Sequence, residues 1–199
     1  MRLAHYEATA MREIPATMKQ VQFDATLKYN ESHQLYRPVT EPAYVGEPTP
    51  EIDAAWKDLL GAINVFVTPK EESQLGGGLW LDPETGLHMA QVSVFHDLHC
   101  INMLRQSLYL DYYSNLKDST WQAHVEHCID ALRLSLMCAG DMTFIPIKWS
   151  ENRNWIMPIF ETVHSCRDYD ALKKWSSDRD AADPNLLYKN AARLHAKGI

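Results

Sequence analysis

The sequence repeats one pattern typical of metal ligands, His-x-x-His-Cys, at two places in its central part. Each copy places two imidazoles and one thiol within five residues: His96, His99 and Cys100 in the first, His124, His127 and Cys128 in the second. Residues three and four apart share a face on an α-helix, so each copy presents its three side chains together if its segment is helical. Two such helices packed side by side would gather four imidazoles and two thiols in one place.

Hydrophobic periodicity predicts that both copies lie on helices, over roughly 93–115 and 120–139. The connection between these helices is short, which favours antiparallel neighbours. An earlier amphipathic helix is expected to begin at Thr49 and Pro50, because a capping residue is followed there by a proline suited to the first turn. We therefore expect a mainly α fold: a helical domain with two antiparallel motif-bearing helices, an extended N-terminal arm and few short strands.

Proline content and periodicity divide the chain into three predicted segments. Residues 1–48 are interpreted as an extended N-terminal arm, because prolines are frequent toward its end and periodicity is weak. Residues 49–176 are expected to form a metal-binding helical domain. Residues 177–199 are predicted to be a polar tail with a short helix over 184–196.

Two stretches of the central segment are harder to assign. The chain between Gly140 and Pro158 is predicted to be irregular, because it shows no sustained periodicity. A last helix is expected to begin at Ser165 or Cys166 and to run to about Trp175.

Composition and charge exclude several classes of function. The formal net charge is −7, from 19 basic and 26 acidic residues, and no Lys/Arg run stands out. Nucleic acid is therefore not an expected partner. No apolar run reaches the roughly 20 residues that a membrane span needs, so we expect no span in this chain. The segment Met1–Thr17 resembles neither a signal peptide nor an anchor.

The donor types narrow the choice of metal. Imidazole suits copper, zinc, iron and nickel, and a thiolate adds preference for Cu(I) and zinc. Four histidines without a carboxylate argue against a carboxylate-bridged di-iron site. The pattern therefore predicts one or two bound ions. Three roles stay open for Cys100 and Cys128: metal ligands, a disulfide between the helices, or buried free thiols.

Two residues outside the repeats are further candidates for the site. Asp141 follows the second helix, where a carboxylate could orient a ligand histidine or act as a base. His164 could bring a fifth imidazole from the C-terminal part of the chain. The structural alternative for Asp141 is a capping or turn residue.

Further segments extend the pattern, and together with the two repeats they resemble the UstYa-like family of fungal secondary-metabolism proteins. The matching segments lie between about residues 50 and 175: 52–56, 94–105, 124–133 and 164–170, with Cys138, Asp141 and Trp175. The resemblance implies a copper-dependent oxidoreductase that tailors a natural-product intermediate by oxidative cyclisation, desaturation, hydroxylation or halogenation. Zinc or iron is a weaker expectation than copper.

By position, the resemblance also implies roles for single residues. The four motif histidines would be metal ligands, and Cys100, Cys128, Asp141 and His164 would be supporting or catalytic. The implied substrate is a small molecule or a peptide-derived compound, and homo-oligomerisation stays open. Family members usually carry an N-terminal membrane anchor, which implies the lumen of the secretory pathway. This chain shows no such anchor, so a cytoplasmic location is the alternative. Asp97 stands where the family most often has Gln.

Two rival interpretations remain. The first is a non-redox cyclase or isomerase on the same fold, with the metal acting only as a Lewis acid. The second is a non-catalytic module stabilised by zinc, which predicts a closed four-ligand site and unfolding on metal removal.

Overall fold

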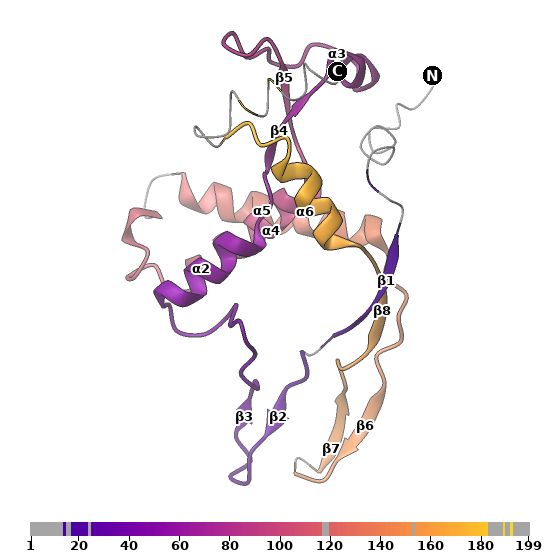
Figure 1. Cartoon of the computed structure of the whole chain (residues 1–199). Coiled ribbons are helices and arrows are strands. Elements are labelled where there is room, and N and C mark those ends of the chain that lie inside the picture. Colours follow the sequence, from indigo (N-terminus) through magenta and orange to yellow (C-terminus); the bar gives the residue numbers. More distant parts are fainter. Residues whose placement is uncertain are drawn as a thin grey trace.

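The computed structural model describes residues 14, 17–23, 25–116, 120–152, 154–182, 189 and 192 of the 199-residue chain. Within this part the chain forms five α-helices and eight short strands (Figure 1). Helices account for 39% and strands for 20% of the structure. The predicted mainly α fold is therefore wrong, because hairpins make up a substantial share of the molecule beside the helices.

Four of the helices carry the arrangement on which the site depends. They are α2 (Pro50–Leu59), α4 (Ser93–Ser107), α5 (Trp121–Ala139) and α6 (Tyr169–Ser177). The start of α2 follows the sequence signals, since the Thr49 side chain accepts a hydrogen bond from the Ile52 amide at 3.3 Å. The end of α5 does too, because Gly140 adopts a left-handed conformation with φ 52°. The fifth helix, α3 (Pro69–Gln74), is a short one.

The strands form four separate antiparallel pairs rather than one sheet. The pairs are β1 (Met18–Gln22) with β8 (Val163–Arg167), β2 (Lys28–Tyr29) with β3 (Leu35–Tyr36), β4 (Asn64–Val67) with β5 (His88–Gln91), and β6 (Ile147–Ser150) with β7 (Trp155–Pro158). The β2–β3 and β6–β7 hairpins extend from the same side of the helices (Figure 1).

Two helix predictions and one loop prediction differ from the structure. The first motif helix ends at Ser107 rather than near 115. The last helix begins at Tyr169, because Asp168 caps it by accepting a hydrogen bond from the Ala171 amide. Ser165 and Cys166 belong instead to strand β8. The stretch expected to be irregular contains the β6–β7 hairpin.

The N-terminal arm is tied to the C-terminal part of the chain. Strand β1 pairs with β8 along its whole length, and the Phe23 amide then donates to the Thr162 carbonyl at 2.8 Å. The boundaries of the three predicted segments stay predictions. The short helix expected over 184–196 lies outside the described residues, as does most of Met1–Thr17. None of the described helices is both long and apolar enough to cross a membrane.

A buried polar cluster fixes α4 against α2. The Arg105 side chain is only 4% exposed, and its guanidinium lies 2.7 Å from the Asp53 carboxylate. Arg105 also donates to the Tyr113 hydroxyl at 2.8 Å, and this hydroxyl donates to Asp53 at 2.8 Å. Because α4 carries the first His-x-x-His-Cys copy, this cluster positions one half of the predicted site.

Replacing Asp53 with Ala is expected to lower the free energy of unfolding by about 2–3 kcal/mol, because Arg105 would keep its buried charge without a carboxylate partner. Urea unfolding at neutral pH measures the change. The matched control is Asp58→Ala on the same helix, whose side chain is 92% exposed and pairs with the surface residue Lys173. That variant is expected to change stability by less than about 0.5 kcal/mol. Equal effects of the two substitutions would contradict the role of the cluster.

Candidate metal centre

The four motif histidines face one another between α4 and α5. Their ring centroids form a closed quadrilateral: 5.6 Å from His96 to His127, 6.1 Å from His99 to His124, and 6.4 Å between the two histidines of each helix. The earlier histidine of α4 meets the later one of α5, so the two helices run antiparallel. The repeat therefore places all four imidazoles at one contact between the helices. We call these residues the histidine quartet.

The quartet is open on one side. His127 is exposed, whereas the other three histidines are half-buried. Partial burial lowers the pKa of His99, and the nearby His124 and His96 lower it further. A lowered pKa favours the neutral imidazole, which is the form that binds a metal ion. The quartet is therefore most exposed to solvent at His127, whereas the His99 side chain is partly buried.

The quartet fits a metal in donor chemistry, whereas its rings stand farther apart than those of a bound ion. Imidazoles bound tetrahedrally to one ion would place their ring centroids about 5 Å apart. The edges observed here, 5.6–6.4 Å, are somewhat longer. Among the described residues, no three His, Cys, Asp or Glu side chains stand close enough to hold an ion as they are placed.

Cys100 and Cys128 lie together behind the histidines. Both are fully buried free thiols, and they form a small core cluster with Met103. Cys100 Sγ lies 3.8 Å from His96 Nδ1. Burial, followed by the neighbouring Cys128, raises the pKa of Cys100 to about 12. The two free thiols therefore pack together in the core, with Cys100 beside His96, and their ligation of a metal stays a prediction.

A hydrogen bond across the helices fixes their register. Ser135 on α5 donates to the Asp97 carboxylate on α4 at 2.6 Å, and both side chains are partly buried. Sequence reasoning did not find this contact. The antiparallel packing predicted from the two motifs could have indicated this contact. When His96 lies opposite His127, the residues of α5 that follow His127 approach the start of α4. The bond lies next to His96 and so helps to hold the quartet in register.

Asp141 and His164 contact each other, and no hydrogen bond or ring contact given for the described residues joins them to the quartet. His164 Nδ1 donates to the Asp141 carboxylate at 2.6 Å, and its Nε2 is hydrogen-bonded to the Thr162 hydroxyl at 2.7 Å. The Phe23 ring stacks on the imidazole, with centroids 3.7 Å apart. Asp141 follows the end of α5, and the helix from His127 to its last residue is about 18 Å long.

The environment of Asp141 and His164 differs from that of an open catalytic pair. The His164 side chain is 10% exposed and the Asp141 side chain 54%. Hydrogen bonds from Thr143, followed by the one from His164, lower the pKa of Asp141 to about 2. Both ring nitrogens of His164 are occupied within the protein. The structure thus brings the two predicted residues together as a contact between the end of α5 and strand β8, and their catalytic role stays a prediction.

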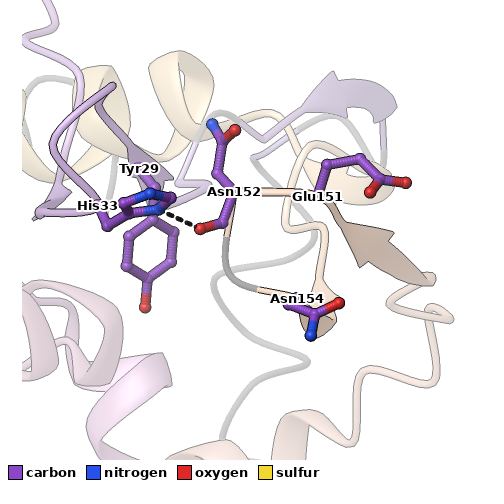
Figure 2. A pocket seen from close by; sticks show the side chains of 5 residues that line it. All are labelled: Tyr29, His33, Glu151, Asn152 and Asn154. Atoms are coloured by element: carbon purple, nitrogen blue, oxygen red, sulfur yellow. Dashed lines mark hydrogen bonds between the residues drawn. The ribbon is translucent and has the colours of Figure 1, made fainter.

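A hollow of about 520 Å³ lies elsewhere, between the tips of two hairpins (Figure 2). It is polar, and His33 Nδ1 closes one side by donating to the backbone carbonyl of Asn152. Its lining contains none of the predicted site residues: Tyr29, His33, Glu151, Asn152 and Asn154. The geometry assigns it no chemistry.

Comparison with known proteins gives one family and several relatives. The family described as "Mycotoxin biosynthesis protein UstYa" matches residues 3–179. The UstYa family oxidase phomYd of Diaporthe leptostromiformis is 32% identical over 140 residues, which are 68% of this chain and 46% of that protein. The oxidase ustYa of Aspergillus flavus is 33% identical over 132 residues, 64% of this chain and 59% of that protein.

A further relative carries a different name. The transacylase cctO of Talaromyces islandicus is 28% identical over 161 residues, 67% of this chain and 51% of that protein. The chain therefore spans about half the length of the curated relatives it matches. No solved structure matches the chain.

Proposed function

Because the chain belongs to the UstYa family, we propose that it is a copper-dependent oxidase that tailors an intermediate of a fungal natural-product pathway. The observation that carries this proposal is the closed quadrilateral of four imidazoles between α4 and α5. Imidazole is a preferred copper donor. The relatives named as oxidases support the redox class. Since the match covers only part of those proteins, the activity and substrate of the whole protein belong to the proposal as well.

Each part of the quartet has a distinct task in this proposal. His96, His99, His124 and His127 would hold the copper, which supplies one-electron chemistry with O₂ when bound. His99 offers a neutral ligand on the buried side. The thiols of Cys100 and Cys128 exclude water from behind the rings. The exposed edge at His127 leaves room for a small-molecule or peptide-derived substrate to approach.

The proposed class of reaction rests on the relatives named as oxidases. We propose an oxidative tailoring step, namely cyclisation, desaturation, hydroxylation or halogenation at a bound intermediate. The protein's own residues would orient the substrate at the open edge and keep competing water away. The location of the protein, in the secretory lumen or the cytoplasm, stays a prediction.

One observation favours a second candidate function. The relative cctO is named a transacylase, so a group transfer without net oxidation is compatible with membership of the family. A metal at the quartet would then serve as a Lewis acid. Dependence on O₂ separates the two candidates, because only the oxidase consumes it.

The deciding experiment compares the chain loaded with Cu(II) and with Zn(II). Electron paramagnetic resonance of the copper form should show nitrogen hyperfine structure from several imidazoles, and elemental analysis should give one or two ions per chain. With the reductant ascorbate, the copper form should consume O₂ and the zinc form should not. Tight zinc retention without copper exchange would favour the structural module, and copper binding without O₂ consumption would favour the non-redox enzyme.

Copper affinity is expected to fall by about tenfold or more between pH 7.5 and 5.5, because protons compete for the ligand nitrogens. The lowered pKa of His99 reduces its own share of this competition. Competition with a colorimetric chelator at each pH measures the change. An affinity that stays constant over this range would contradict ligation by histidine.

A further inference from the structure

The turn between β2 and β3 carries a short sequence pattern that has no part in the histidine quartet. Asn30-Glu31-Ser32 follows the pattern Asn-x-Ser/Thr, with a residue other than proline in the middle, which marks the acceptor of an N-linked glycan. In the 199 residues no other Asn has Ser or Thr two positions later. Because the sugar is bulky and polar, this pattern can be used only where it lies on the surface.

The fold places this pattern at the tip of a hairpin. Asn30, Glu31 and Ser32 are all exposed, and the β2–β3 hairpin carries them away from the helices (Figure 1). The His33 amide donates to the Asn30 carbonyl at 3.0 Å, which closes a β-turn around the pattern. His33 itself is left-handed, with φ 59°, and leads the chain back into β3. The acceptor therefore lies in a surface turn rather than in a packed element.

The Asn30 side chain can carry a sugar and keep its bonds within the turn. Its Oδ1 accepts from the Gln34 amide at 2.9 Å, and its Nδ2 donates to the Gln34 side chain at 3.1 Å. Nδ2 bears two hydrogens, and a glycan replaces only one of them. The Ser32 hydroxyl, which the pattern requires, makes no hydrogen bond within the part of the chain that the structure describes. One Nδ2 hydrogen and this hydroxyl are therefore both available at the surface.

The surface beside the turn suits a sugar as well. Tyr29, which precedes the acceptor, and His33 line one side of the polar hollow between the two hairpin tips (Figure 2). The other side carries the carboxylate of Glu151 and the amides of Asn152 and Asn154. Carboxylates accept hydrogen bonds, and amides both donate and accept them, so these groups match the hydroxyls of a sugar. A glycan at this turn would therefore meet a polar surface.

We propose that Asn30 accepts one N-linked glycan when the chain is synthesised into the secretory lumen. In this transfer Nδ2 forms a bond to C1 of the first sugar and loses one proton. The bond from C1 to the pyrophosphate of a lipid-linked oligosaccharide breaks, and the lipid pyrophosphate leaves, so no oxidant or reductant is needed. The proposal is independent of the oxidase activity, and it rests on the lumenal location, which is itself a prediction.

Expression of the 199-residue chain in yeast, behind a cleavable secretion signal, tests the proposal. Wild type should carry one glycan that endoglycosidase H removes, and peptide mass spectrometry after complete enzymatic deglycosylation should show Asn30→Asp. Ser32→Ala should lose the glycan, whereas Ser32→Thr should keep it, because the pattern requires a hydroxyl. The matched control is Asn154→Gln, which changes an exposed asparagine at the other hairpin tip and should keep the glycan. Wild type without a glycan, or Ser32→Ala with one, would overturn the proposal.

A second measurement asks whether the folded turn accommodates the sugar. Ser32→Ala removes the glycan but leaves the bonds between Asn30 and Gln34 in place, so it is the proper reference. Urea unfolding of the secreted glycosylated wild type and of Ser32→Ala should give the same midpoint, because the sugar attaches at an exposed tip and displaces no packed side chain. If the glycosylated chain is retained unfolded while Ser32→Ala is secreted folded, the native turn does not accept a glycan.

Discussion

The double substitution His99→Ala/His127→Ala is expected to lower copper affinity by roughly 10³-fold or more, because half of the nitrogen donors are lost. His99 and His127 occupy opposite corners of the quadrilateral, since each has His96 and His124 as its neighbours. The variant keeps two imidazoles, but they too lie at opposite corners. Competition with a chelator of known affinity, together with elemental analysis, measures the loss.

The control for this experiment removes two histidines outside the quartet. His33 lies in the β2–β3 turn, and His88 bonds the Leu79 carbonyl at 3.0 Å. The variant His33→Ala/His88→Ala should bind copper like wild type. Urea unfolding of the quartet variant should show that it still folds. Full copper stoichiometry in the folded quartet variant would show that the metal binds elsewhere.

Replacing His164 with Ala is expected to lower the free energy of unfolding by about 3 kcal/mol and to leave copper affinity unchanged. The buried imidazole is 8% exposed, stacks on Phe23, and bonds Asp141 and Thr162. Its removal opens a cavity and strands the Thr162 hydroxyl. Thermal or urea unfolding measures the stability, and chelator competition measures the copper affinity.

Asp141→Asn provides a milder companion to this variant. The carboxylate contributes stability above its ordinary pKa of 3.8, and this contribution is lost as the pH falls toward about 2, the value in the folded protein. The difference between wild type and Asp141→Asn should therefore be full at neutral pH and should vanish in acid. If either variant loses activity without losing stability, the Asp141–His164 pair has a catalytic role instead.

The histidine quartet could be predicted from the sequence because its geometry is local. A spacing of three residues on a helix fixes which side chains share a face, and the short connection fixes the antiparallel packing. The same holds for the start of α2 at Thr49 and the end of α5 at Gly140, where one or two residues determine the backbone. These features depend on neighbours within one or two helical turns.

The β1–β8 pair could not be predicted in the same way, because its two strands lie far apart in the sequence. Strand β1 finds its partner β8 only after the whole domain intervenes. The sequence predicts a helix that begins at Ser165 or Cys166, but pairing with β1 and the Asp168 cap move the helix start to Tyr169. Strands β6 and β7 lie exposed, so burial periodicity gives little signal. Long-range pairing thus outweighed local propensity.

The pairing of β1 with β8 also affects the order in which parts of the protein fold during synthesis. Gln20 lies opposite Ser165, 145 residues later in the chain. At ordinary rates of translation, β1 would wait roughly 10–30 s for its partner to be synthesised. Both quartet helices emerge during that interval, so the histidine site can assemble on the nascent chain before the two ends of the domain are joined. If the quartet binds copper as proposed, a ribosome-stalled chain long enough for α5 to have left the exit tunnel should already take up the metal.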